Sequence, residues 1–285
     1  MNNFIITTDY GTDINEYFFK KYNISRIPFP VFLNGQPYVN QNYHDFYQQM
    51  RTGAAVPSTS LINPEEAISF LENFLARGMD IIHITLSSGI TGTYNSFLTA
   101  AENLKEKYPN RKIAIIDSLC ASAGQGLLYI KALELQQAGK SYDEVNTWVL
   151  NNRLNIIHLF TVDSLFYLQR TGRVSKTTAI IGTALGVKPI MYVDNNGKLL
   201  VKSKVRGRRN SIDTMTNWIS QLYDNTNNPF VFIAHADCAE DAQYFAEVIQ
   251  KQYSCDVYIA EISPLIGAHS GPGTLHVAFY GSARP

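Results

Sequence analysis

Short apolar runs alternate with helical patterns through the first half of the chain, and this alternation constrains the fold more than any other feature of the sequence. The runs are rich in β-branched and aromatic side chains and end at polar or turn residues, as buried strands do. Predicted strands cover residues 4–8, 27–33, 80–86 and 112–117, and predicted helices cover residues 64–77, 94–108, 121–139 and 142–152. Because parallel strands are joined by helical crossovers, the pattern predicts an α/β fold.

The second half of the chain has a different pattern. The polar turn at residues 194–197 separates two strand-like runs and predicts an antiparallel hairpin. Further predicted strands cover residues 229–234, 256–262 and 274–280, and predicted helices cover residues 210–222 and 240–253. We therefore expect an N-terminal α/β domain over residues 1–155, with a mostly parallel sheet and flanking helices. A C-terminal α/β domain over residues 156–285 is expected to have a mixed or antiparallel sheet.

The charge balance argues against several classes of partner. The 285-residue chain has 24 Lys and Arg against 24 Asp and Glu, a formal net charge of +0. Without net positive charge, we expect neither nucleic acid nor an anionic membrane surface as the main partner. No apolar stretch approaches the roughly 18 residues that span a bilayer, so we expect no stable membrane insertion and a cytoplasmic protein.

The spacing of cysteine and histidine indicates neither a disulfide framework nor a metal site. Cys120, Cys238 and Cys255 are odd in number and lack C-x-x-C spacing. The six histidines lack the spacing of a paired metal-ligand motif, so we expect no metal and no cofactor. Charged residues make up only 17% of the chain, whereas Tyr and Phe number 17 and 15. This bias favours an apolar interior larger than packing alone requires.

The segment SSGITGTY at residues 87–94 joins a predicted strand to a predicted helix. Backbone amides at such a junction, together with the helix N-terminus and the hydroxyls of Ser88, Thr91 and Thr93, suit a phosphate or a carboxylate. The segment lacks the Gly-Lys-Ser/Thr of a nucleotide P-loop and the Gly-x-Gly-x-x-Gly of dinucleotide sites. An ordinary tight turn is the alternative interpretation.

Two further segments carry groups that suit an anion. Thr59 and Ser60 lie just before a predicted helix, and loops at the strand ends of an open α/β sheet meet at one crevice. A plain turn is the alternative for this hydroxyl cluster. His269 lies in the glycine-rich segment 264–275. We interpret it as a donor to an anion or as a general base. The alternative is a histidine whose ring forms hydrogen bonds only with local backbone groups.

Two other segments contain arginines that are candidates for binding an anion or a partner. Arg173 follows a glycine and can steady an anion, although pairing with a structural carboxylate is the commoner arrangement. Arg206, Arg208 and Arg209, with two nearby lysines, form a local positive run. A solvated edge is the simplest interpretation of the run, and a docking surface for an acidic or phosphate-bearing partner is the sharper one.

Four segments support a family resemblance when they are taken together and in order. They are SSGITGTY at residues 87–94, LQRTGR at 168–173, KPI at 188–190 and IGAHSGPGTL at 266–275. With these motifs the chain resembles the DegV family of bacterial fatty-acid-binding proteins. The resemblance extends from Thr8-Asp9 to Phe279, and the glycine-rich motif around His269 is its most specific part.

The resemblance implies a two-domain α/β protein that holds one long-chain fatty acid in an apolar tunnel, with the carboxylate near the domain interface. Family members hold the carboxylate with hydroxyl groups that correspond here to Thr59 and Thr91. The other matched positions are Ser60, Ser88, Gly92 and His269, with Arg173 beside the head group. Several such proteins carry the lipid for a bacterial fatty acid kinase, in which a separate ATP-using subunit makes the acyl phosphate. A subunit of this kind performs no phosphoryl transfer itself.

Three positions depart from the usual family pattern. Leu61-Ile62-Asn63 follows the Thr-Ser pair where Gln-Pro-Ser is usual, Thr91 replaces serine, and Tyr10 follows Thr-Asp where serine is common. The threonine keeps the hydroxyl and adds a methyl group. We expect these changes to alter chain preference or access to the head group and to leave an anion site in place.

Two other functions remain open. A hydrolase or acyltransferase would use Ser88 or Cys120 as nucleophile with His269 as base, but the sequence has no Gly-x-Ser-x-Gly elbow and Cys120 has small neutral neighbours. A lipid-sensing or storage protein would bind the same fatty acid without any contact to a kinase.

Overall fold

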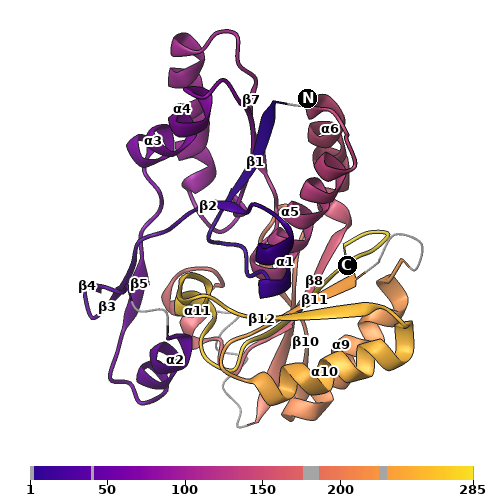
Figure 1. Ribbon diagram of the computed structural model, residues 1–285. Helices are drawn as coiled ribbons and strands as arrows, with labels where there is room; N and C mark the ends of the chain where they lie inside the picture. The colour runs from indigo at the N-terminus through magenta and orange to yellow at the C-terminus, as the bar shows by residue number, and fades with distance from the viewer. Residues whose placement is uncertain (1–2, 40–41, 176–185, 225–229, 285) are drawn as a thin grey trace.

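The computed structural model describes residues 3–39, 42–175, 186–224 and 230–284, which fold around two main sheets (Figure 1). The first sheet is parallel, with the strand order β2-β1-β6-β7. Its strands are β1 (Phe4–Asp9), β2 (Ser25–Ile27), β6 (Asp80–Thr85) and β7 (Ile113–Asp117). Buried side chains fill nearly all of β1 and β6, as expected of parallel strands that are covered on both faces. The parallel sheet predicted for the first half is confirmed.

Helices cover both faces of this first sheet (Figure 1). The helices α3 (Pro64–Leu75) and α4 (Thr93–Lys107) pack together on one face, and α5 (Ser122–Gln137) and α6 (Tyr142–Asn152) pack together on the other. A capping box begins α3, since the Asn63 side chain accepts the Glu66 N–H and the Glu66 carboxylate accepts the Asn63 N–H. Ser141 and Glu144 form the same arrangement at the start of α6. The predicted caps therefore fix where these helices begin.

The strand predicted over residues 27–33 is wrong as a single element. The chain leaves the first sheet after Ile27 and joins a small antiparallel sheet instead. Pro28 and Pro30 explain the break, because neither has an N–H to donate to a strand ladder. The small sheet has the order β4 (Gln36–Pro37), β3 (Val31–Leu33), β5 (Pro57–Thr59).

The second main sheet is mixed, with the strand order β10-β9-β8-β13-β11-β12. Its strands are β8 (Ile156–Thr161), β9 (Val187–Val193), β10 (Leu199–Arg206), β11 (Phe230–His235), β12 (Asp256–Glu261) and β13 (Leu275–Tyr280). The predicted hairpin is present as β9 and β10. β13 lies between β8 and β11 and runs antiparallel to both, whereas β11 and β12 are parallel. The expected mixed sheet is confirmed; Pro229, where we expected β11 to begin, lies outside the described residues.

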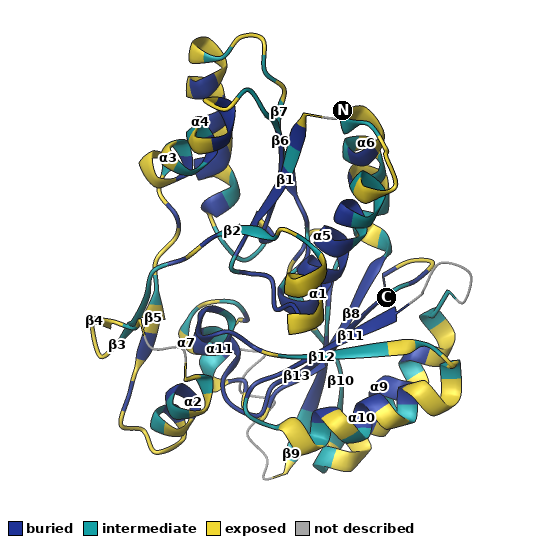
Figure 2. Ribbon diagram, viewed as in Figure 1, coloured by how far each residue is buried: buried dark blue, intermediate teal, exposed yellow. Residues whose placement is uncertain are grey.

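The helix α5 lies between the two main sheets. On one side the Gln125 Nε2 donates to Asp9 Oδ1 of β1 over 3.0 Å. On the other side α5 packs against β8, β11 and β13 of the second sheet. Residues 122–130 are all buried, and Figure 2 shows α5 dark blue where the sheets approach it. The two halves of the chain therefore share one helix, and a domain boundary at residues 155/156 remains a prediction.

The remaining helices complete the fold. They are α1 (Glu16–Lys21), α2 (Tyr43–Arg51), α7 (Phe166–Arg170), α9 (Arg208–Leu222), α10 (Ala239–Tyr253) and α11 (Pro264–Ser270). The outer sides of α9 and α10 are exposed while their inner sides pack on the second sheet (Figure 2). Across the described residues, none of the helices combines the length and the apolar character needed to cross a membrane.

Candidate ligand-binding site

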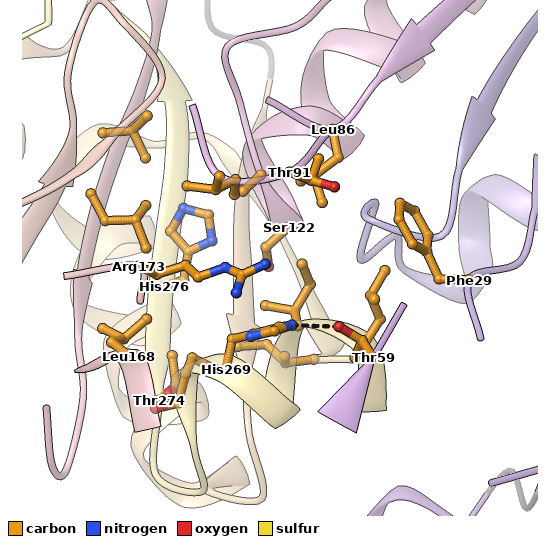
Figure 3. Close-up of a pocket in the computed structure, with 18 of the residues that line it drawn as sticks. Phe29, Thr59, Leu86, Thr91, Ser122, Leu168, Arg173, His269, Thr274 and His276 are labelled. Atoms are coloured by element: carbon orange, nitrogen blue, oxygen red, sulfur yellow. Dashed lines mark hydrogen bonds between the residues drawn. The ribbon is translucent and has the colours of Figure 1, made fainter. Parts of the chain in front are cut away.

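A cavity of about 290 Å³ lies where the small sheet, α11, the start of α5 and the second sheet meet (Figure 3). Most of its wall is apolar. The apolar lining residues are Phe29, Leu61, Leu86, Ile90, Ala121, Phe160, Leu168, Val193, Leu199, Ile262, Leu265 and Ile266. The cavity therefore offers an apolar ligand a surface of aliphatic and aromatic side chains.

Hydroxyl groups lie near the outer end of the cavity. Ser60 and Gly92 are exposed, and Thr59 and Thr91 are half-buried, while all four line the same cavity. The Thr91 Oγ1 lies 3.0 Å from the Thr93 Oγ1 and accepts the Thr93 N–H at the start of α4. The structure thus brings together the end of β5 and the loop before α4, whose hydroxyls the sequence marked, and places them at the mouth.

His269 comes to the same place from α11. Its Nε2 lies 2.8 Å from the Thr59 Oγ1, the contact dashed in Figure 3. Burial, followed by the nearby Arg173 and Arg170, lowers the pKa of His269 to about 3, so the imidazole is neutral at pH 7. The buried Nδ1 has no hydrogen-bond partner among the described residues. A neutral imidazole in this position orients the Thr59 hydroxyl and supplies no positive charge.

Glycines of the segment 264–275 make room for two tyrosine rings. A Cβ atom at Gly267 would lie 2.2 Å from the Tyr47 hydroxyl, and a Cβ atom at Gly271 would lie 2.3 Å from the Tyr167 ring. Gly271 also has φ +83°, which favours glycine. No helix or strand was predicted for this glycine-rich segment, and residues 264–270 form α11. These glycines let α11 pack closely and so fix the position of His269.

The positive charge at the cavity comes from Arg173, which lines the wall beside Leu168. Its guanidinium donates to the Thr171 carbonyl, and burial lowers the pKa of Arg173. Its neighbour Arg170, which sequence reasoning left without a role, donates to the Pro57 and Ala268 carbonyls over 2.9 and 3.3 Å. Arg170 therefore ties β5 to α11 and holds Thr59 near His269.

Ser88 lies apart from the other predicted site residues. Its side chain is exposed, the residue does not line the cavity, and its N–H donates to Asp117 Oδ1 over 3.0 Å. The preceding Ser87 donates its hydroxyl to the Gly197 carbonyl over 2.8 Å. This contact fixes the loop to the β9–β10 hairpin, so Ser87 has a structural role that the sequence did not reveal.

The inner end of the cavity holds two histidines that sequence reasoning set aside. His158 on β8 and His276 on β13 both line the wall and are buried. They are 118 residues apart in sequence, and no local spacing marks them as a pair. Their proximity could be predicted only from the antiparallel pairing of β8 with β13.

The predicted docking arginines differ in their surroundings. Arg206 is exposed at the end of β10. Arg208 donates its Nε to Asp241 Oδ2 over 2.8 Å and a terminal nitrogen to the Cys238 sulfur over 3.2 Å. The guanidinium carbon of Arg209 lies 3.5 Å from the centre of the Tyr244 ring. Arg206 and Arg209 thus have more freedom to meet a partner than Arg208.

The residues proposed for a nucleophilic mechanism do not form that arrangement. Burial raises the pKa of the Cys120 thiol to about 11, and the sulfur lies 3.1 Å from a guanidinium nitrogen of Arg284. The Nε2 of His269 contacts Thr59 instead of Ser88 or Cys120. Among the described residues, no three or more His, Cys, Asp or Glu side chains are grouped so that they could hold a metal ion.

The fold and the cavity together define a class of α/β proteins with an apolar ligand cavity beside a mixed sheet. A family model described as "Uncharacterised protein, DegV family" matches residues 3–282. This chain belongs to the DegV family.

Known relatives cover the whole chain. A DegV domain-containing protein of Clostridium perfringens is 38% identical over 290 residues, which cover 100% of this chain and 99% of the relative. The crystal structure of DegV from Bacillus subtilis, described as a fatty acid binding protein, is 27% identical with a TM-score of 0.84 over 99% of this chain and 100% of its own. A DegV lipid binding protein from Thermotoga maritima is 25% identical with a TM-score of 0.83 over 98% and 99% of the two chains.

Proposed function

We propose that this protein binds one long-chain fatty acid in the cavity, with the carboxylate at the mouth and the acyl chain directed toward the inner end. The observation that carries the proposal is a mostly apolar cavity whose wall also holds the hydroxyls of Thr59 and Thr91 and the charged side chain of Arg173. Thr59 and Thr91 are the proposed carboxylate donors. Their neighbours Ser60, Gly92 and His269 shape the mouth. The solved relatives described as lipid- or fatty-acid-binding proteins support this assignment.

The two ends of the ligand contribute differently to affinity. A C16 to C18 chain gains about 0.8 kcal/mol per buried CH₂, roughly 11 to 13 kcal/mol before ordering and association costs. A buried carboxylate without partners would lose several kcal/mol of that gain. The main effect of the hydroxyl donors at the mouth is therefore to avoid the cost of an unpaired carboxylate. They add little affinity beyond that, and they fix the orientation of the ligand.

Native mass spectrometry followed by denaturing extraction tests the proposal directly. An apolar cavity of this kind is expected to keep host lipid through purification, and a bound mass of a C14 to C18 fatty acid supports the proposal and identifies the preferred chain. A ligand-free mass, together with no thermal shift on addition of palmitate or oleate, would overturn it. The departures at Leu61 and Thr91 would then be the first positions to exchange.

Replacing the proposed carboxylate donors should change selectivity for the head group. In the variant Thr59→Ala with Thr91→Val, we expect the ratio of fatty acid affinity to fatty alcohol affinity to fall by roughly tenfold, because two donors to the carboxylate are lost. Isothermal titration with palmitate and hexadecanol measures the ratio. Ser58→Ala is a matched control, since Ser58 is the exposed hydroxyl next to Thr59. An equal loss of affinity for acid and alcohol would contradict the proposed division of roles.

We further propose that the protein presents the carboxylate to a separate ATP-dependent kinase subunit in the cytoplasm, which forms the acyl phosphate. The protein itself then has no catalytic residue and needs no cofactor beyond its lipid. The exposed mouth at Ser60 and Gly92 supports this, because a partner could reach the head group there. Arg206, Arg208 and Arg209 are the proposed docking surface. A lipid-sensing or storage protein without a kinase partner is the alternative.

Charge reversal tests the docking surface. The double variant Arg206→Glu with Arg209→Glu is expected to lower binding to a kinase subunit at least tenfold, because like charges at an interface repel. Arg208 is left unchanged, since a glutamate there would face Asp241. Pull-down and surface plasmon resonance measure the effect, with retained fatty acid as the control for folding. Unchanged binding would remove this surface from the proposal.

A further inference from the structure

Two imidazole rings form a polar pair in the inner wall of the cavity. His158 and His276 project from neighbouring strands, and their side chains are on the same face because Ala278 pairs with His158 and His276 is two residues away. The rings stack with centroids 5.2 Å apart and planes 8° from parallel, and the His158 Nδ1 lies 3.2 Å from the His276 Nε2. Only 1% of His158 and 5% of His276 is exposed.

The fold makes space for this pair. A Cβ atom at Gly124 of α5 would lie 2.0 Å from the His158 Cε1, so only glycine admits the ring. On the other side, Phe160 meets His276 edge-on with centroids 6.1 Å apart. Two aliphatic side chains would fill the same wall with no polar atom to desolvate, whereas an imidazole pair brings polar nitrogens into an apolar surface at a cost in stability.

Both rings are neutral, and this fixes what they offer to a ligand. Burial, with contributions from Arg284 and His276, lowers the pKa of His158, and burial lowers the pKa of His276 to about 3. Two neutral imidazoles have one N–H each, and one of these lies in the bond between the rings. The outer nitrogens, His158 Nε2 and His276 Nδ1, therefore always include one donor and one acceptor. The buried His158 Nε2 has no partner among the described residues.

We infer that the His158–His276 pair recognises a polar substituent on the acyl chain, a hydroxyl or keto group remote from the carboxylate. This inference rests on the proposed function and names its ligand class more closely: oxygenated long-chain fatty acids. A hydroxyl group fits because it can donate to one imidazole nitrogen or accept from another. A keto group fits because one of the two outer nitrogens always carries an N–H that can donate to a carbonyl oxygen.

The pair suits such a substituent better than it suits the carboxylate. A carboxylate needs donors and positive charge, and Thr59, Thr91 and Arg173 supply these elsewhere on the cavity wall, with Thr59 in contact with His269 and Arg173 near that ring. The neutral pair has no net charge and lies among the buried residues Phe160 and Val193 of the inner wall. An uncharged oxygen that must leave water can regain a hydrogen bond there, whereas elsewhere on the apolar wall it would lose one.

The test compares stearate with a series of C18 acids that carry one hydroxyl group at different carbons. We expect one positional isomer to bind at least as tightly as stearate and the other isomers to bind roughly tenfold or more weakly, because only one position places the hydroxyl against the pair. Competition against a fluorescent fatty acid measures all affinities on one preparation. In His276→Phe, the ratio of the preferred isomer to stearate is expected to fall about tenfold.

Controls separate a recognition role from a structural one. His83→Phe removes another buried histidine, which stacks on Phe97 outside the cavity, and should leave the ratio unchanged. On the wild-type protein, ¹⁵N NMR of the imidazoles should show a change in His158 and His276 tautomers with the preferred isomer and none with stearate. Two outcomes would overturn this inference while leaving the proposed function intact. In the first, stearate binds but all hydroxylated isomers bind equally weakly; in the second, His276→Phe leaves the affinity ratio unchanged. Failure of stearate itself to bind would overturn the proposed function as well.

Discussion

The free energy of unfolding is expected to fall by about 2.7 kcal/mol per pH unit when the pH is lowered from about 6 to about 4, which is the largest effect that the buried titratable groups predict. Burial lowers the pKa of five histidines, and the shift is large for four of them, His235 being the fifth. The four are His83, His269 and His276, each with a pKa of about 3, and His158, whose pKa is well below its ordinary value. Below pH 6.5 the unfolded chain protonates these groups and the folded protein does not, so acid favours unfolding.

Two carboxyl groups oppose this trend in part. Burial raises the pKa of Asp9 and of Asp13 to about 6, although each accepts hydrogen bonds, from Gly11 and Leu86 at Asp9 and from Ser263 and a serine hydroxyl at Asp13. Between about pH 4 and pH 6 the folded protein holds one proton on each of these carboxyls that the unfolded chain has released. The unfolded chain therefore binds about two more protons than the folded protein in this range. Acidification still lowers the free energy of unfolding, as the histidines alone would predict.

Urea unfolding at pH 6, 5 and 4 measures the slope, and a variant checks its origin. His83→Phe removes a ring that lies 2.8 Å from the Thr7 hydroxyl and stacks on Phe97. The slope should then fall by about 1.4 kcal/mol per pH unit, the value for one proton. Stability that rises on acidification, or a slope that His83→Phe leaves unchanged, would show that these histidines are protonated in the folded protein.

Truncation of Arg284 is expected to destabilise the protein by about 4 kcal/mol, the second largest effect. Its buried guanidinium donates to the carbonyls of Leu119, Ile156, Asp194 and Arg153 over 2.7 to 3.1 Å. These carbonyls come from both halves of the chain. In Arg284→Met the aliphatic volume is kept, but the buried carbonyls lose their donor, and an unpaired buried carbonyl costs about 1 to 3 kcal/mol.

Chemical denaturation measures this loss, and two further variants interpret it. Ser282→Ala changes an exposed side chain two residues away and should have little effect. Arg284→Lys keeps the charge but cannot match the planar set of donors, so most of the stability should still be lost. An Arg284→Met protein as stable as the wild type would mean that desolvation of the guanidinium cancels its hydrogen bonds.

Much of the fold could be predicted because its signals are local. Capping residues and apolar periodicity identified α3 and α6, and the polar turn at residues 194–197 identified the hairpin. The error at residues 27–33 came from reading apolar content without giving Pro28 and Pro30 their weight. The helix α11 escaped notice because its glycines lower helix propensity, and tertiary packing against Tyr47 overrides that preference.

The site could be predicted only where its residues lie in recognisable motifs. Thr59, Thr91 and His269 lie in such segments, and the structure places them on one cavity. Ser88 lies in a motif as well, but the loop turns its side chain outward. His158 and His276 could not be paired from the sequence, because their contact depends on strand register across 118 residues.

The central place of β13 has a consequence for the timing of synthesis. The strand β13 lies between β8 and β11, and it supplies His276 to the cavity while α5 packs against all three strands. A nascent chain that has not yet released residues 275–280 from the ribosome can pair β11 with β12 but cannot close the second sheet around α5. The cavity therefore forms only after residues 275–280 have left the ribosome and β13 has paired with β8 and β11. Under the proposed function, lipid is acquired after that step, and contacts of such long sequence separation should make the step slow in folding.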